Sequence, residues 1–271
     1  MKSTHTPRNL AVPQILLLAS IVALWSMPAL AQARAQRMSD KEVKELIEQV
    51  DTGRDKFEGN LDGGFKGSIV RGPNGEVKVS GALQDYQDNT KKLKDRFTPE
   101  YAASAEVLTV LKQSNAIDKF MLNADSSMKG RSEWDRQTQY LKQLAAAYGA
   151  TFPLPEGATV RRMNDKETSA AAAAMAAAAD RFKNDLDKDK TLAKPDKDAA
   201  KKDVELLIRQ ANDVKSRTSD GKLATGQMTD LVAQTAKVQA FVAAHPPPST
   251  TNWQGVQSSF GKLQQAFGLN P

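Results

Sequence analysis

The sequence of 271 residues has no cysteine and only two histidines, His5 and His245. Without cysteine the chain cannot form disulfides, use thiol catalysis, hold an iron–sulfur cluster or carry a lipid anchor on a cysteine. Two histidines give poor support to nucleophile–histidine catalysis and too few ligands for a usual zinc site. We therefore expect a protein that is not an enzyme, with no catalytic residue, no metal ligand and no cofactor.

A concentrated basic face is also missing. The chain carries 38 Lys and Arg against 32 Asp and Glu, a net charge of +6, and both signs are interspersed along it. A nucleic-acid-binding protein would more often gather its basic residues on one face, with aromatic residues among them. The mild basic excess therefore indicates a soluble protein surface, and we expect no nucleic-acid partner.

The sequence has no long apolar run that would cross a membrane comfortably. Its most apolar stretch, "ILLLASIVALW" (15–25), is short and follows the basic residues Lys2 and Arg8. A small-x-small pattern then permits cleavage after Ala31 or Ala33, as in a secretory signal peptide. We expect a periplasmic or secreted protein that meets the membrane only through its export signal. The alternative is an uncleaved N-terminal anchor.

The spacing of apolar residues is helical along nearly all of the mature chain, which predicts an all-α fold. Ser39 and Glu42 form a capping-box pattern that predicts a helix start, and Thr98-Pro99-Glu100 indicates another. Gly149 follows the apolar positions of a further helix and is expected to end it.

One glycine-rich stretch, 63–81, interrupts the helical pattern. Its "GPNG" lies between apolar pairs and predicts either a small β-hairpin or a flexible loop. Lys66, Arg71 and Lys78 in this stretch could bind an anion, but an exposed loop accounts for them equally well.

Several segments recur in the same order. "EWDRQTQYLKQLAAAYGA" (133–150) matches "NWQGVQSSFGKLQQAFGL" (252–269), and "DKFEGNLD" (55–62) matches "DRFKNDLD" (180–187). Matches at nearly constant offset predict a tandem duplication of a four-helix unit. The predicted organisation is a signal peptide over 1–33, a first helical bundle over 34–150, a linker over 151–169 and a second bundle over 170–271.

The aromatic residues of the two matched helices could serve packing or binding. Trp134, Leu141, Leu144 and Tyr148 recur at helical spacing and share one face. The other positions of that face are aliphatic, so we expect core packing rather than an aromatic platform for a glycan or peptide. Trp134 and its counterpart Trp253 should both be largely buried.

The segment "LKDRFTPEYAASAEVLTVLKQSNAIDKFM" (93–121), followed by "EWDRQTQYLKQLAAAYG" (133–149), carries a resemblance. It resembles predicted secreted helical proteins of unknown function that are common in acidobacterial-type soil bacteria. The resemblance covers most of 83–150 and, more loosely, 204–269. It implies export and a helical fold, and it implies no activity.

One acidic segment, "DLDKDKTLAKPD" (185–196), has carboxylates at the spacing of a calcium loop. Asp185, Asp187, Asp189 and Asp196 occupy positions 1, 3, 5 and 12. However, Lys190 stands where such a loop needs glycine, so a solvated charged turn explains the segment better.

The sequence thus predicts an exported, non-catalytic helical protein that is structural or interacts with an envelope or extracellular protein partner. The alternative is an extracytoplasmic protein that binds or senses a ligand such as calcium, an anion or a glycan.

Overall fold

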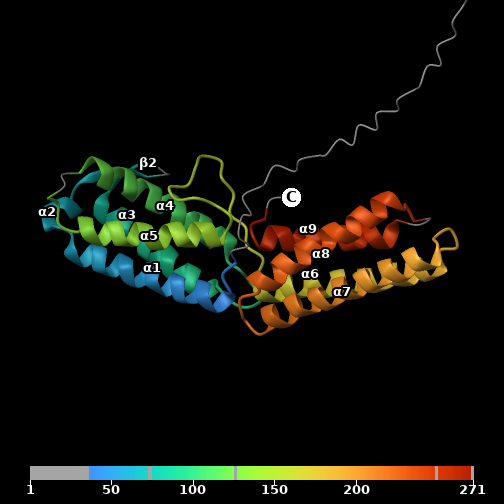
Figure 1. Ribbon diagram of the computed structural model, residues 1–271. Coiled ribbons are helices and arrows are strands. Elements are labelled where there is room, and N and C mark those ends of the chain that lie inside the picture. The colour runs from blue at the N-terminus through green and yellow to red at the C-terminus, as the bar shows by residue number, and fades with distance from the viewer. Residues whose placement is uncertain (1–36, 73–74, 125–126, 248–249, 270–271) are drawn as a thin grey trace, which may run out of the picture. The chain divides into compact units, whose positions relative to one another are not determined.

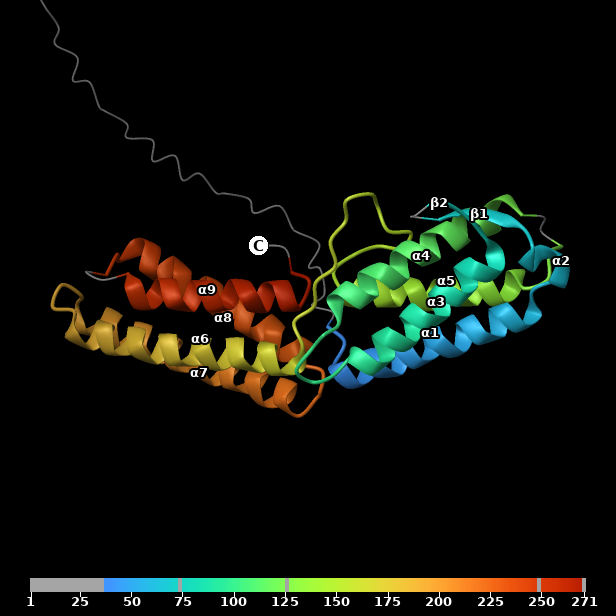
Figure 2. The same ribbon diagram turned by 180° about the vertical axis from the view of Figure 1, so that it is seen from behind.

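A computed structural model describes residues 37–72, 75–124, 127–247 and 250–269. The predicted signal peptide over 1–33 lies outside these residues. Within the described part the chain is almost entirely helical, which confirms the all-α prediction (Figures 1 and 2). No helix among the described residues is both long and apolar enough to span a membrane.

The first bundle consists of four long helices. They are α1 (Asp40–Asn60), α3 (Val79–Arg96), α4 (Ser104–Asn123) and α5 (Arg131–Ala147). Helix α1 packs on α3 and α5, and α4 packs on the same two helices (Figure 1). Their apolar faces enclose one core, whose largest fully buried side chains include Trp134, Tyr86, Tyr148 and Phe57.

A short helix and a hairpin connect α1 to α3. Helix α2 (Gly63–Lys66) precedes the antiparallel strands β1 (Ile69–Gly72) and β2 (Gly75–Lys78), with Ile69 opposite Lys78. Of the two alternatives for this stretch, the hairpin is therefore the one that forms.

The second bundle consists of α6 (Asp165–Lys188), α7 (Lys194–Ser219), α8 (Thr225–Ala244) and α9 (Thr251–Ala266). Helix α6 packs on α7 and α9, and α7 packs on α8. This bundle has a core of its own. Nine of the ten residues from Ala170 to Ala179 are alanine and give α6 little bulk, and its buried alanines let neighbouring helices approach closely.

Two predicted boundaries were wrong. Helix α4 begins at Ser104 rather than at Pro99, because Thr98 and Tyr101 exchange backbone hydrogen bonds in a tight turn. The predicted linker over 151–169 is also too long, since α6 begins at Asp165, where Asn164 and Glu167 form a capping box.

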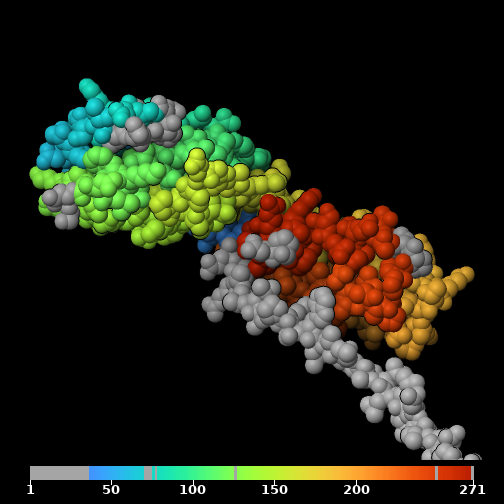
Figure 3. Space-filling view, turned by 90° about the horizontal axis from the view of Figure 1, so that it is seen from above, coloured from blue at the N-terminus to red at the C-terminus, as the bar shows by residue number. Residues whose placement is uncertain are grey.

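The connecting segment before Asp165 also belongs partly to the first core. Phe152, Leu154 and Val160 are buried there. The side-chain amide of Asn115 donates a hydrogen bond to the carbonyl of Leu154 and accepts one from its backbone N–H. In Figure 3 this segment, in yellow tones, lies on the surface of the first bundle. We call this packed connection, residues 151–164, the strap. Its turns and prolines explain why its sequence lacks helical spacing.

Candidate functional site

The two bundles meet where α1 and α6 begin, and both helices start in the same way. Ser39 and Asn164 each accept a hydrogen bond from the backbone N–H three residues ahead. In return, the carboxylates of Glu42 and Glu167 accept from the N–H of Ser39 and of Asn164. Both helices therefore begin with a complete capping box, which fixes the direction of the two residues before each cap.

These fixed starts place two arginine–aspartate pairs across the junction. Arg37 Nη1 lies 2.5 Å from Asp165 Oδ1, and Arg162 Nη2 lies 2.7 Å from Asp40 Oδ1. The second oxygen of each aspartate accepts from the opposite helix: Asp40 Oδ2 from the N–H of Asp165, and Asp165 Oδ2 from the N–H of Asp40. Each carboxylate thus also satisfies a free amide at the start of the other bundle's first helix.

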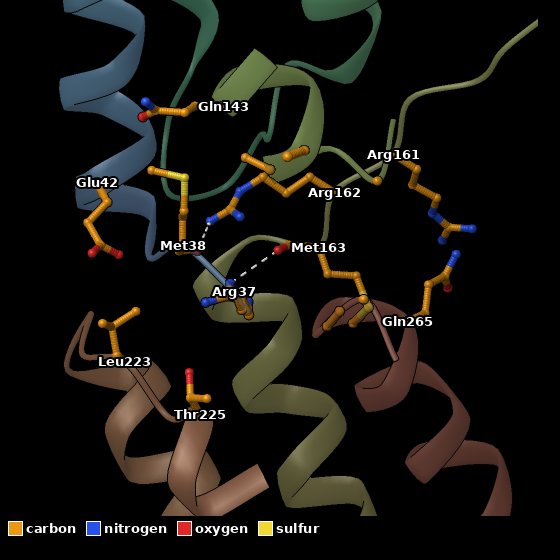
Figure 4. Close-up of a pocket in the computed structure, with 15 residues that line it drawn as sticks. Arg37, Met38, Glu42, Gln143, Arg161, Arg162, Met163, Leu223, Thr225 and Gln265 are labelled. Carbon is orange, nitrogen blue, oxygen red and sulfur yellow. Dashed lines mark hydrogen bonds between the residues drawn. The ribbon is translucent and has the colours of Figure 1, made fainter. Parts of the chain in front are cut away.

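The arginines complete the reciprocal arrangement through the backbone. Arg37 Nη2 donates to the carbonyl of Met163 at 3.1 Å, and Arg162 Nη2 donates to the carbonyl of Met38 at 2.8 Å (Figure 4). We call this set, Arg37, Asp40, Arg162 and Asp165, the clasp. Every contact in it has a counterpart in which the two bundles exchange roles.

The clasp is largely removed from water. The side chains of Arg37 and Arg162 are only 4% and 3% exposed. Burial lowers the pKa of Arg37, and repulsion from the nearby Arg162 guanidinium adds to this effect against the attraction of Asp165. The Nε atoms of both arginines have no hydrogen-bond partner within the described part of the chain. The two aspartates balance the two positive charges but leave these donors unsatisfied.

A cavity of about 420 Å³ lies beside the clasp. Its lining comes from both bundles and the connecting strap: Arg37, Met38, Glu42, Gln143, Ala146, Ala147, Gly149, Arg161, Arg162, Met163, Leu223, Thr225, Gln265, Ala266 and Gly268. Figure 4 shows Arg161 and Gln265 pointing toward one another on one side, with Leu223 and Thr225 on another. This concave surface collects polar side chains from several helices around an apolar middle, as small-molecule sites do.

Within the described part of the chain, Arg161 differs from its neighbour Arg162 in having no acidic partner. Its side chain is exposed, and no ion pair or hydrogen bond to its guanidinium is found among the described residues. Its backbone N–H donates to the carbonyl of Tyr148 at 3.0 Å, which fixes the base of the side chain at the cavity. Glu42 is the only acidic residue among the described lining residues, and its Oε2 accepts from the N–H and the hydroxyl of Ser39.

The sequence contained a signal for the clasp that our predictions missed. "RMSDKE" (37–42) recurs as "RMNDKE" (162–167), a separation of 125 residues. This is also the separation between "DKFEGNLD" (55–62) and "DRFKNDLD" (180–187). The residues upstream of those matches therefore contain two matched pairs, Arg37 with Arg162 and Asp40 with Asp165.

The acidic segment 185–196 does not form the loop that calcium requires. Asp185 and Asp187 lie in the last turn of α6, where Asn252 and Lys201 bind their carboxylates. Asp189 ends the helix and accepts hydrogen bonds from Thr191, and Asp196 lies in the first turn of α7. Across the described residues, no group of three or more metal-binding side chains is brought together.

The remaining candidates are separate from the clasp. Lys78 is exposed and Lys66 half-buried beside the hairpin, and the side chain of Arg71 lies outside the described residues. His245 ends α8, where its exposed ring stacks on Phe241.

Trp134 and Trp253 are 1% and 3% exposed, so the prediction of buried tryptophans is confirmed. Each indole packs against a phenylalanine of the first helix in its bundle, Trp134 on Phe57 and Trp253 on Phe182. Their centroid separations are 4.9 and 5.2 Å. The aromatic platform is thereby excluded at both positions, because neither ring face is open to a ligand.

No family model matches the chain, and no match was found among curated proteins or solved structures. The resemblance to predicted secreted helical proteins therefore stays a prediction from the sequence, and functional inference rests on the clasp and its cavity.

Proposed function

We propose that this chain is an exported, non-catalytic interaction protein of the periplasm or extracellular space. The two helical bundles would present their surfaces jointly to an envelope or extracellular protein partner. The clasp is the observation that carries this proposal. Its buried and mutually capped charges favour one arrangement of the bundle starts, because a shift that separates an arginine from its aspartate while both stay buried would leave an unpaired charge.

Export is supported by the sequence alone. If the leader is removed as expected, the protein recovered from the periplasm or medium will begin at Gln32 or Arg34. N-terminal sequencing of that fraction tests this step, and a chain that retains the leader would instead favour the anchor.

The interaction itself can be tested with photo-reactive residues placed on both bundles. Lys142 on α5 and Lys262 on α9 are exposed and suit this purpose. We expect both positions to crosslink the same envelope protein, and Asp165→Ala to weaken the capture at both. Asp220→Ala, which removes only an exposed ion pair with Lys222, should leave it unchanged. If neither position captures a protein, the proposal fails.

A second candidate, an extracytoplasmic ligand-binding or sensor protein, is favoured by the cavity beside the clasp. Its volume of about 420 Å³ is within the usual range for small-molecule sites. Residues of both bundles line it, so an occupant would contact both and stabilise their arrangement.

A further inference from the structure

We propose that the cavity beside the clasp binds a small organic carboxylate with an apolar body, whose carboxylate pairs with Arg161. This inference deepens the second candidate function and rests on it. The proposal follows from the charges and the apolar surface around one space.

The polar side chains that line the cavity favour binding of an anion. Arg161 brings a guanidinium without an acidic partner among the described residues, and Gln265 points toward it (Figure 4). The carboxylate of Glu42 is directed to Ser39 in the capping box. A guanidinium presents parallel N–H donors that match the two oxygens of a carboxylate, so a planar carboxylate is the preferred anion.

The clasp arginines strengthen this preference. Arg37 and Arg162 also line the cavity, so two further guanidinium groups lie near an occupant. The repulsion between these two guanidinium groups, which contributes to the lowered pKa of Arg37, would be relieved by a nearby negative charge.

The rest of the lining favours an apolar body on that carboxylate. Met38 and Met163 flank the space, and the side chain of Leu223 remains 49% exposed at its edge. Flexible thioethers adapt to ligands of different shape, and an exposed leucine gains from being covered. An inorganic anion such as phosphate would leave these groups uncovered, so it should bind less well.

The test uses residues 34–271, which lack the predicted signal peptide, and 3-phenylpropanoate as the probe. Binding is measured by titration calorimetry and by the shift in Tm. Acetate tests the apolar body, 3-phenylpropanamide tests the charge, and inorganic phosphate tests the preference for a carboxylate. We expect 3-phenylpropanoate to bind at least about tenfold more tightly than the amide, since one charge-assisted contact is worth that much. We also expect it to bind more tightly than acetate and phosphate, which bring no apolar body to cover the lining.

Two matched variants locate the site. Arg161→Gln removes the exposed guanidinium and should weaken binding of 3-phenylpropanoate about tenfold. Arg136→Gln removes another exposed arginine from the first bundle, beside a different groove, and should leave binding unchanged. Ala147→Phe fills part of the cavity and should also weaken binding, with its fold verified by circular dichroism.

Three results would overturn the proposal: no binding of 3-phenylpropanoate, equal binding of acetate, the amide or phosphate, or equal binding by the Arg161→Gln variant. None of these results bears on capture of a protein partner by the crosslinking experiment. Loss of capture with retained carboxylate binding would reject the interaction protein and keep the ligand-binding candidate.

Discussion

Asp40 accepts a hydrogen bond from the backbone N–H of Asp165 at 2.8 Å, and Asp165 accepts one from the N–H of Asp40 at 2.9 Å. Each aspartate is therefore the first residue of its own helix and a capping group for the other helix. Because Arg37 and Arg162 bind the remaining oxygens, the removal of one aspartate affects both bundles.

Asp40→Ala and Asp165→Ala should destabilise the protein to a similar degree. Each change leaves a buried arginine without its carboxylate and a helix start without one acceptor. Breaking a buried ion pair in this way costs about 3–5 kcal/mol. Urea unfolding followed by circular dichroism measures the loss. Asp220→Ala is the control, because its partner Lys222 is exposed and the change should cost less than about 1 kcal/mol. Strongly unequal losses for the two clasp variants would contradict the reciprocal arrangement.

The two tryptophans should differ when each is replaced by phenylalanine. Trp134 Nε1 donates to Asp118, which is 9% exposed, whereas Trp253 Nε1 donates to the exposed Gln239. Trp134→Phe leaves a buried carboxylate without this donor and should cost about 2–3 kcal/mol beyond the packing loss. Gln239 keeps its bond from Gln257, so Trp253→Phe should cost about 1 kcal/mol for the lost bond. Thermal unfolding compares them, and equal losses would show that the burial of the acceptor does not matter.

Two glycines in helices should respond in opposite directions to alanine. A Cβ at Gly53 would lie 2.2 Å from Gln137 Oε1, and Gln137 is held by the carbonyl of Val50 and the hydroxyl of Tyr86. Gly53→Ala should therefore destabilise the first bundle. Gly261 has open space around its Cβ position, so Gly261→Ala should stabilise α9 by about 0.5–1 kcal/mol through helix propensity. Midpoints of urea unfolding measure both effects, and stabilisation by Gly53→Ala would contradict the close approach of α1 and α5.

Alkaline pH should weaken the first bundle through its buried tyrosines. Burial raises the pKa of Tyr148 and of Tyr86 above the usual value. A raised folded-state pKa gives stability that is complete below the unfolded value, about 10, and is lost as pH rises toward the folded value. The free energy of unfolding, measured at a series of pH values from about pH 8 upward, should therefore fall above about pH 10. Tyr148→Phe should reduce this fall, while Tyr140→Phe serves as the control on the half-buried side of α5.

The sequence predicted those features that depend on neighbouring residues. The Ser39–Glu42 capping box, the left-handed Gly149 after α5 and the burial of both tryptophans are local or periodic signals, and all are confirmed. The start of α4 was wrong because Thr98 and Tyr101 pair with one another, and no spacing rule along the chain reveals that choice.

The candidate site was harder to predict because its members are far apart in the sequence. Arg37 and Asp165 are separated by 128 residues, and the short segments "RM" and "DKE" do not by themselves point to a binding site. The calcium spacing of Asp185, Asp187 and Asp189, by contrast, is a local pattern. Lys190 already disfavoured this pattern in the sequence, and in the structure α6 continues through it and each carboxylate has a different partner. The duplication itself stays a prediction, with matched contacts in its favour.

The reciprocity of the clasp has a consequence for assembly. In an isologous interface, one patch of a subunit meets the same patch of a second subunit across a two-fold axis. Arg37 with Asp165, and Arg162 with Asp40, repeat that pattern inside one chain. A protein built from one such bundle would leave its arginine and aspartate unpaired as a monomer and could satisfy both by forming a homodimer. Joining two bundles in one polypeptide replaces that concentration-dependent association with an intramolecular contact.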